Sequence, residues 1–370
     1  MVPTVPESTV KLPLAVEAPS EPDGSLVDSL DRRTAPAELW QPHVHARDSV
    51  RCVACAHGCV VATGARGACG VRLNRNGVLH APFGYVARRY VRAIETNTVY
   101  HVLPGARALT FGMYGCDLRC PYCHNHRLSQ ALRDGSSDER PTEIEAEALV
   151  EEAVSAGCSV ICAAYNEPMI AAEWTRAVFE QAKHRGLATV IVSDGNSTPE
   201  ALAYLRHVTD VFRVDLKGAD EETYRKLGGR LAPVLRSIGV ARELGYWVEV
   251  VTLVVPTLNH ELSGLRSIAR ALRALDSAIP WHLNAFVPRY RLKALPPADP
   301  NLLLSAVGMA YAQGLEFVYA GNVNALSELS HTRCPGCHHV VIRRQNYTTL
   351  SNVLDHGHCP ECRRVIAGLW

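Results

Sequence analysis

The sequence predicts an α/β protein with a partial (β/α)6 barrel at its centre. Two observations carry this prediction. From Ala106 onward, short apolar runs alternate with stretches of helical periodicity, which is typical of βα units and a parallel sheet. In addition, most of the 13 cysteines form clusters before, within and after this region. We therefore expect an N-terminal Cys-rich module and a C-terminal zinc-ribbon-like module around the barrel.

Seven apolar runs are the predicted strands. They are LTFGMY, SVICAAY, ATVIVS, VFRVDL, WVEVVTLVV, WHLNAFV and, near Phe317, EFVYAG. Between the first two, Thr142 and Glu145 have the spacing of a capping box, and an amphipathic helix is predicted from there to Gly157. Thr198 before Pro199 predicts the start of another helix. The runs thus predict about six βα units and a seventh strand.

The N-terminal segment has a different composition. Residues 1 to about 45 are rich in Pro, Ser, Glu and Asp, which disfavours a packed core. We expect a disordered tail over 1–45, the Cys-rich module over 46–100, the barrel over 101–328 and the ribbon-like module over 329–370.

Composition restricts the class of protein. The formal net charge is +1, so no strong nucleic-acid signal is present. The chain shows neither a signal peptide nor an apolar run long enough for a membrane span, which requires roughly 18 to 20 residues. We therefore expect a cytoplasmic protein with no membrane partner, whose clustered cysteines bind metal rather than form disulfides.

The most informative motif is the run GCDLRCPYCHN, which holds Cys116, Cys120 and Cys123. A structural zinc site usually has four ligands and paired CxxC knuckles, and this triplet has neither. A 4Fe-4S cluster held by three cysteines keeps one iron open for a ligand. The alternative is a chance grouping, or a mixed zinc site with His124 or His126.

Polar residues follow three consecutive predicted strands, where the active residues of a (β/α) barrel gather at one rim. They are Tyr165, Asn166, Glu167 and Pro168, then Ser193, Asp194, Gly195 and Asn196, and then Asp215 and Lys217. Each motif alone is weak evidence, but their order after the cysteine triplet strengthens them.

The triplet, with Tyr122 before its last cysteine, resembles the radical S-adenosylmethionine (SAM) superfamily. More specifically, the chain resembles the radical SAM member of the AmmeMemoRadiSam group, related to pyruvate formate-lyase activating enzymes. The segments that carry this resemblance are CVACAHGCVVATGARGACGVR, YHVLPGARALTFGMYGCDLRCPYCHN, AAYNEP, VDLKG, WVEVVTLVVPTLN, PWHLNAFVPRY and FVYAGN.

The resemblance implies a radical SAM barrel with a 4Fe-4S cluster on Cys116, Cys120 and Cys123. It implies reductive cleavage of SAM to methionine and a 5′-deoxyadenosyl radical, which abstracts hydrogen from a substrate. The electron donor would be a protein such as flavodoxin or ferredoxin. The implied SAM-binding residues are Tyr122, Asn166, Glu167, Ser193, Asp194, Asn196, Asp215 and Lys217.

The chain departs from the activase pattern at two places. The two glycines of a GGEP-like segment are Tyr165 and Asn166 here, while Glu167 and Pro168 remain. The first acid of a DTNG-like turn is Val192, so no monovalent cation site is carried over.

The flanking cysteines form two further sets. Cys334, Cys337, Cys359 and Cys362 form two CPxC knuckles about 20 residues apart, which predict a zinc ribbon. Cys52, Cys55, Cys59 and Cys69 suit either zinc or a second iron–sulfur cluster, and closed four-cysteine sites slightly favour zinc. Cys158 and Cys162 are expected to be buried without metal. His101, before the first predicted strand, could lie behind the cluster ligands, but a solvated loop histidine is the favoured expectation.

Three functions follow from these observations. The first, which we favour, is a radical SAM enzyme acting on an unidentified substrate. The second is an activase that generates a glycyl radical on a partner protein, so that the substrate would be a protein. The third is a non-catalytic zinc-ribbon binding protein. A glycyl-radical partner encoded nearby would distinguish the second from the first, and the intact cysteine triplet argues against the third.

Overall fold

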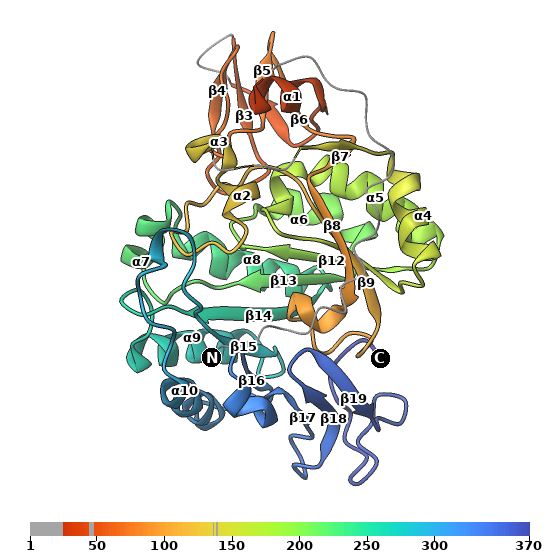
Figure 1. Ribbon diagram of the computed structural model, residues 1–370, viewed down its shortest axis with the longest axis vertical. Coiled ribbons are helices and arrows are strands. Elements are labelled where there is room, and N and C mark those ends of the chain that lie inside the picture. Colours follow the sequence, from red (N-terminus) through yellow and green to blue (C-terminus); the bar gives the residue numbers. More distant parts are fainter. Residues whose placement is uncertain (1–24, 44–47, 136, 138–139) are drawn as a thin grey trace.

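An eight-stranded sheet forms the centre of the computed structural model, which describes residues 25–43, 48–135, 137 and 140–370 (Figure 1). The strand order is β16-β15-β14-β13-β12-β11-β9-β8. The strands are β8 (Arg88–Ala93), β9 (Arg107–Gly112), β11 (Val160–Ala163), β12 (Ala188–Ser193), β13 (Val211–Asp215), β14 (Trp247–Val254), β15 (Trp281–Ala285) and β16 (Val318–Gly321). The strands from β9 to β16 are parallel and β8 is antiparallel. Because β8 and β16 do not pair with each other, the barrel is incomplete, which confirms the predicted fold class.

Helices connect the parallel strands. They are α4 (Ala146–Ser155), α5 (Ala172–His184), α6 (Pro199–Leu205), α7 (Glu221–Leu227), α8 (Leu231–Glu243), α9 (Leu262–Leu275) and α10 (Pro300–Ala312). The cap of α6 is confirmed, because the Thr198 side chain accepts a hydrogen bond from the amide of Ala201.

The capping box predicted for α4 is wrong. Thr142 and Glu143 instead form the short strand β10, which pairs with β7 (Tyr85–Val86), and Glu145 makes no side-chain cap. The helix itself is confirmed, because its apolar stripe of Leu149, Val150 and Ala153 is buried. Local cap spacing was overridden here by pairing with a distant strand.

The two faces of the sheet follow the period-two alternation of strand residues. One face carries Phe111, Ile161 and Phe212 into the core against the helices. The opposite face carries Val160, Val190 and other residues of a second apolar cluster, which also holds Ile94, Val99 and Val102 from the β8–β9 connection. This connection therefore fills part of the barrel interior.

The N-terminal module is larger than the sequence suggested. It contains α1 (Leu26–Arg32), β1 (Thr34–Pro36), β2 (Trp40–Pro42), β3 (Ser49–Cys52), β4 (Val60–Ala62), β5 (Leu73–Arg75), β6 (Val78–Pro82) and β7. Two small antiparallel sheets, β1-β6-β5 and β2-β3-β4, form its frame.

Two predicted boundaries change as a result. Residues 25–43 were assigned to the disordered tail, but Leu30, Ala37 and Leu39 are buried in the core. The rest of the predicted tail lies outside the described residues. Residues 88–93 were assigned to the Cys-rich module, but as β8 they pair with β9 along their whole length, so the sheet continues across that boundary.

The C-terminal module is a three-stranded sheet of β17 (Thr332–Arg333), β18 (Val340–Gln345) and β19 (Thr348–Asn352). The last residues of the chain return to the barrel, where Val102 and Leu369 form a β-bridge. His101 is buried there and contacts Ala367 and Tyr319, so its expected place in a solvated loop is wrong. The cause is packing against residues that are more than 200 positions away in the sequence.

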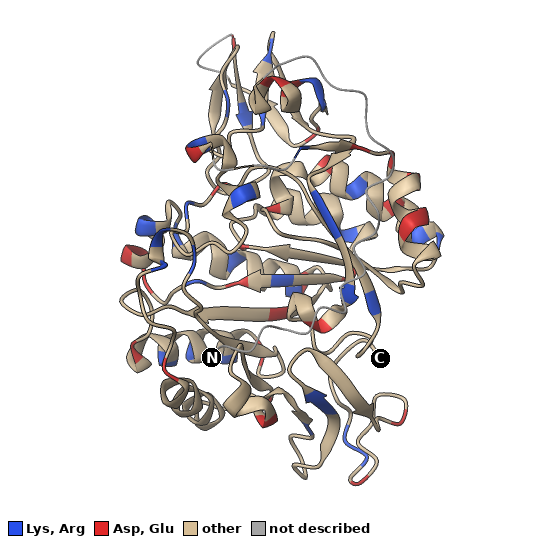
Figure 2. Cartoon of the chain, viewed as in Figure 1, with Lys and Arg blue, Asp and Glu red and all other residues tan. Residues whose placement is uncertain are grey.

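Basic and acidic residues are interspersed along the chain, and the central strands carry few of them (Figure 2). None of the helices in the described ranges is long and apolar enough to span a membrane.

Candidate functional site

The three cysteines of the central motif lie on the loop that follows β9, before the short helix α2 (His126–Ser129). Gly115 allows this loop to fold. Its φ is +93°, and a Cβ there would lie 2.8 Å from a methyl carbon of Val71. The Cys123 sulfur lies 3.2 Å from Ser129 Oγ, and the Cys116 sulfur lies 3.8 Å from Asp194 Oδ2. The loop therefore brings the thiols to the carboxyl ends of the strands, as predicted.

The spacing of these ligands distinguishes a cluster from a single ion. Four thiolates on one tetrahedral zinc lie about 3.8 Å apart, given Zn–S bonds of about 2.3 Å. Within the described ranges, Cys116 forms such a close group only with Asp117 and Asp194, and not with Cys120 or Cys123. The three sulfurs are therefore not gathered as one tetrahedral ion would hold them, which is consistent with an iron–sulfur cluster, in which each cysteine binds a different iron.

The alternative ligands His124 and His126 take no part in any close ligand group among the described residues. His126 instead stacks on the ring of Tyr290, with ring centroids 4.4 Å apart. A mixed zinc site with these histidines is therefore not supported.

The thiols of the triplet are protonated without metal. Burial raises the pKa of Cys120 to about 12 and also raises that of Cys123. Burial and the carboxylate of Asp194 raise the pKa of Cys116 well above its usual range. Since metals bind thiolates, loading this site must release protons.

Three carboxylates gather beside Cys116. Asp117, Glu167 and Asp194 are at most 6% exposed. Burial, together with the charge of a neighbouring carboxylate in each case, raises the pKa of all three. A buried group of carboxylates is unfavourable unless a cation or protons compensate it. The site is thus suited to a cationic ligand.

Glu167 is held firmly by the next strand along the sheet. Its carboxylate accepts hydrogen bonds from Ser193 Oγ at 2.9 Å, from the amide of Asp194 at 2.7 Å and from the amide of Met169 at 3.0 Å. Asn166 Oδ1 accepts from the amide of Met113 at 2.9 Å. These two predicted residues therefore tie together the loops after β9, β11 and β12.

The backbone at Tyr165 adopts a conformation that glycine favours. Tyr165 stands at the first glycine of the GGEP-like segment, and its φ is 72°, in the left-handed region that glycine favours. The tyrosine ring is held in place by an edge contact with Tyr90. In the following turn, Gly195 retains glycine at φ +79°, where a Cβ would lie 2.6 Å from a Val214 methyl carbon.

The remaining predicted residues extend the site across the sheet. Asn196 Nδ2 donates to Asp117 Oδ2 at 2.7 Å. Lys217 Nζ contacts Asp215 Oδ2 at 3.1 Å, and Arg213 contacts the other oxygen of that carboxylate. Although burial opposes it, the charges of Arg213 and Lys217 lower the pKa of Asp215. Tyr122 is buried close to Cys120 and Lys217, and its place beside SAM stays a prediction.

The two flanking cysteine sets differ in geometry. The sulfurs of Cys334, Cys337, Cys359 and Cys362 all lie within 4.8 Å of one another. The Cys334–Cys362 distance is 3.4 Å and the Cys337–Cys359 distance is 3.6 Å, as one tetrahedral zinc requires. This set is therefore consistent with the predicted zinc ribbon. Cys52, Cys55, Cys59 and Cys69 lie on β3 and the loops beyond it and do not form such a close group.

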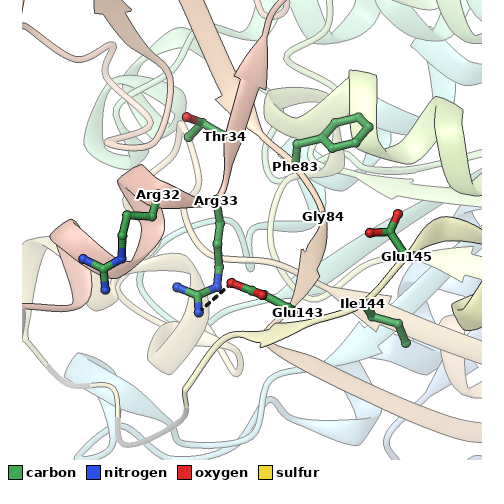
Figure 3. A pocket seen from close by; sticks show the side chains of 8 residues that line it. All are labelled: Arg32, Arg33, Thr34, Phe83, Gly84, Glu143, Ile144 and Glu145. Carbon is green, nitrogen blue, oxygen red and sulfur yellow. Dashed lines mark ion pairs between the residues drawn. The ribbon is translucent and has the colours of Figure 1, made fainter. Parts of the chain in front are cut away.

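A cleft of about 380 Å³ lies elsewhere, between α1, the loop after β6 and β10 (Figure 3). Arg33 and Glu143 form an ion pair across it at 3.0 Å. Its lining contains none of the 13 cysteines and none of the polar residues at the strand ends. It is therefore separate from the candidate site.

Sequence reasoning missed three residues of the site. Asp117 lies inside the cysteine motif, and its position could have revealed it. His57 Nε2 lies 3.2 Å from the carbonyl oxygen of Asp117, and Arg133 Nη2 donates to the carbonyl oxygen of Cys116 at 2.6 Å. No sequence signal marks these two, because only the fold brings them to the site.

Comparisons with known proteins agree with this geometry. Residues 111–263 match the model of the radical SAM superfamily. The chain is 34% identical over 301 residues to an uncharacterized protein, MJ0808, of Methanocaldococcus jannaschii, covering 80% of this chain and 88% of that protein. It is 26% identical over 229 residues to a pyruvate formate-lyase-activating enzyme of Staphylococcus epidermidis, covering 55% of this chain and 88% of the enzyme.

Among solved structures, SuiB of Streptococcus suis bound to S-adenosylmethionine aligns with a TM-score of 0.46 and 12% identity, over 63% of this chain and 54% of that one. The sequence matches, with the cysteine triplet on the loop after the first parallel strand, identify the family. Membership implies a 4Fe-4S cluster and SAM as cofactors. The chain belongs to the radical SAM superfamily.

Proposed function

We propose that the protein is an enzyme that cleaves SAM reductively at a 4Fe-4S cluster held by Cys116, Cys120 and Cys123, and so abstracts hydrogen from a substrate. The observation that carries this proposal is the buried carboxylate group of Asp117, Glu167 and Asp194 beside Cys116. SAM carries an ammonium and a sulfonium group, and such cations offset buried negative charge.

The chain's own residues then have distinct tasks. Glu167 and Asp194 supply negative charge next to the cysteine loop, and the hydrogen bonds from Ser193 and Met169 hold Glu167 in one orientation. Lys217, beside Cys120, supplies a positive charge for a carboxylate or another anionic group. When bound, the cluster and SAM supply the electron transfer and the radical chemistry.

The barrel interior supports a protected reaction. Ile94, Val99 and Val102 fill the part of the interior near the amino ends of the strands. This packing leaves the polar residues at the carboxyl ends, where Asp215 and Lys217 lie. A substrate entering there would meet the SAM site in a water-poor environment, which a reactive radical requires.

We further propose that the chain is the radical SAM member of the AmmeMemoRadiSam group and an oxidoreductase that acts in the cytoplasm with a flavodoxin or ferredoxin as electron donor. The long sequence segments that resemble this group support the assignment. The substrate is proposed to be a molecule or protein segment that reaches the carboxyl ends of the strands.

The test is production of 5′-deoxyadenosine. Anaerobically reconstituted protein is reduced with dithionite in the presence of SAM, and the products are separated by chromatography. We expect the wild type to form 5′-deoxyadenosine and Cys116→Ala, Cys120→Ala and Cys123→Ala to form none. Cys158→Ala is the matched control, because Cys158 is buried against the helices away from the site. A wild type that binds iron but never forms 5′-deoxyadenosine would refute the proposal.

A further inference from the structure

Cys52, Cys55, Cys59 and Cys69 converge at the boundary between the N-terminal module and the barrel. The sulfurs of Cys59 and Cys69 lie 3.6 and 3.8 Å from the position that a Cβ on Gly67 would occupy. We propose that these four thiolates hold a polynuclear iron–sulfur cluster that passes electrons to the Cys116 site, an inference that rests on the proposed function.

The spacing of the four sulfurs separates this set from the zinc ribbon. The C-terminal sulfurs lie within 4.8 Å of one another, but within the described ranges no three of the N-terminal sulfurs do. One zinc would hold all four about 3.8 Å apart. No such close group is found for the N-terminal sulfurs, as none is found for Cys116, Cys120 and Cys123, and this favours several metal atoms over one zinc.

A buried arginine provides a second, independent observation. Arg72 is 1% exposed and contacts Glu173 through Nη2, while its Nε and Nη1 atoms have no hydrogen-bond partner. Burial raises the pKa of the Cys52 and Cys69 thiols, and the positive charge of Arg72 opposes this rise. An unpaired buried donor is costly, and a negatively charged cluster with four thiolates would accept its hydrogen bonds.

The set is also connected to the central site through short contacts. Arg133 Nη2 donates both to the carbonyl oxygen of Ala68 at 2.8 Å and to that of Cys116 at 2.6 Å. The amide of Ala56 donates to the carbonyl oxygen of Asn196 at 2.8 Å, and Asn196 in turn contacts Asp117. Arg133 therefore bridges the residue next to Cys69 to Cys116, and Asn196 bridges the residue next to Cys55 to the residue next to Cys116.

Electron transfer through the N-terminal cysteine set requires no bond to form or break there. Four cysteines close all ligand positions, so such a cluster transfers electrons and does not bind substrate. One electron enters from a low-potential donor protein such as a flavodoxin, reduces the N-terminal cluster, and leaves it for the Cys116 site. The donor is oxidised by one electron and the Cys116 site is reduced by one.

Metal content tests the site itself. Iron, sulfide and zinc are measured on anaerobically purified full-length protein for the wild type, Cys69→Ser and the control Cys158→Ala. We expect Cys69→Ser to lose iron and sulfide but no zinc, and to keep the electron paramagnetic resonance signal that shifts when SAM is added. Loss of zinc with unchanged iron would overturn the proposal. If Cys69→Ser does not fold, the metal content of the wild type tests the proposal instead. Iron for only one cluster, with zinc at both flanking cysteine sets, would overturn the proposal.

A comparison of reductants tests the transfer. Dithionite is small enough to reduce the central site directly, whereas a flavodoxin must deliver its electron at the protein surface. We expect Cys69→Ser to form 5′-deoxyadenosine at least about tenfold more slowly than the wild type with flavodoxin, and at a similar rate with dithionite. Equal losses with both reductants would refute the transfer role. Absence of product in the wild type with dithionite would instead refute the proposed function.

Discussion

Arg72 of the N-terminal module and Glu173 of α5 form an ion pair in which the two side chains are 1% and 5% exposed. The same carboxylate accepts hydrogen bonds from the amides of Glu38 at 3.0 Å and Leu39 at 3.2 Å. Glu173 of the barrel thus holds both Arg72, in the loop that follows Cys69, and the backbone of Glu38 and Leu39, which precedes the cysteines.

Breaking this pair should destabilise the protein strongly. Arg72→Met leaves the Glu173 carboxylate buried without a cation, and we expect the free energy of unfolding to fall by about 3–5 kcal/mol in urea denaturation. Arg72→Met with Glu173→Gln should recover part of this loss, because the amide oxygen still accepts from the two backbone amides. The control Arg363→Met breaks an exposed pair with Asp355 and should cost at most about 1 kcal/mol. A similar cost for both single variants would contradict the prediction.

Neutralising Asp194 should weaken SAM binding. Asp194→Asn keeps an oxygen that can accept from the amide of Asn196 but removes the negative charge beside Cys116. We expect the Kd for SAM, measured by anaerobic equilibrium dialysis, to rise about tenfold, or about 1.4 kcal/mol. Glu222→Gln, which removes an exposed carboxylate paired with Lys226, should leave the Kd unchanged. An unchanged Kd in Asp194→Asn would show that this carboxylate does not attract SAM.

Stability should decrease in mild acid because of His101. Its Nδ1 donates to the Ala367 carbonyl oxygen at 2.6 Å, which fixes Nε2 as the acceptor from the Tyr319 hydroxyl. Burial lowers the pKa of His101 to about 4. Between about pH 6.5 and 4 the unfolded chain therefore binds a proton that the folded chain does not, and up to about 3 kcal/mol of stability is lost as the pH falls. Burial also lowers the pKa of His282, so this residue contributes to the same loss of stability in acid.

Urea midpoints at several pH values measure this loss. His101→Gln should flatten the pH dependence, whereas His356→Gln, at a side chain that is 95% exposed, should retain it. Because both variants keep the cysteines, release of metal in acid affects them equally. Equal slopes in the two variants would assign the acid sensitivity to other groups.

Removing zinc should loosen the C-terminal module from the barrel. Tyr100 and Tyr319 of the barrel share one apolar cluster with Cys334, Cys359 and Ile366. We expect Cys337→Ser to lose about one zinc per chain and to lower the Tm, because a ribbon depends on its metal for folding. His356→Ala should change neither quantity. A variant that keeps both its zinc and its Tm would exclude Cys337 as a ligand.

The sequence predicted the parallel strands well because each one is buried on both faces and reads as a continuous apolar run. It also located the cysteine loop and the polar strand ends, since motif spacing is a local property. It did not predict the strand over residues 34–36 or the burial of Leu39, because a composition rich in proline and acids hides a segment that is stabilised by distant partners. Tertiary contacts override local propensity at such positions.

The candidate site shows the same division. Glu167 and Asp194 were predicted because they follow strands, whereas the contacts of His57 and Arg133 join residues 60 and 17 positions apart, respectively. The sequence did not indicate that Asp117 joins Glu167 and Asp194 in one buried group, because the three residues come from three separate loops. The density of negative charge depends on the fold. It is this density that distinguishes the candidate cation site from strand ends that merely carry polar residues.

The bridge between Val102 and Leu369 has a consequence for biosynthesis. The segment that fills the barrel interior is synthesised well before its backbone partner, because Val102 and Leu369 are 267 positions apart in the sequence. At roughly 5 to 20 residues per second, the interior segment waits tens of seconds for that partner. This pairing can form only after Leu369 has left the ribosome, so a chain truncated just before Leu369 would keep its cysteines and lack this bridge to the barrel.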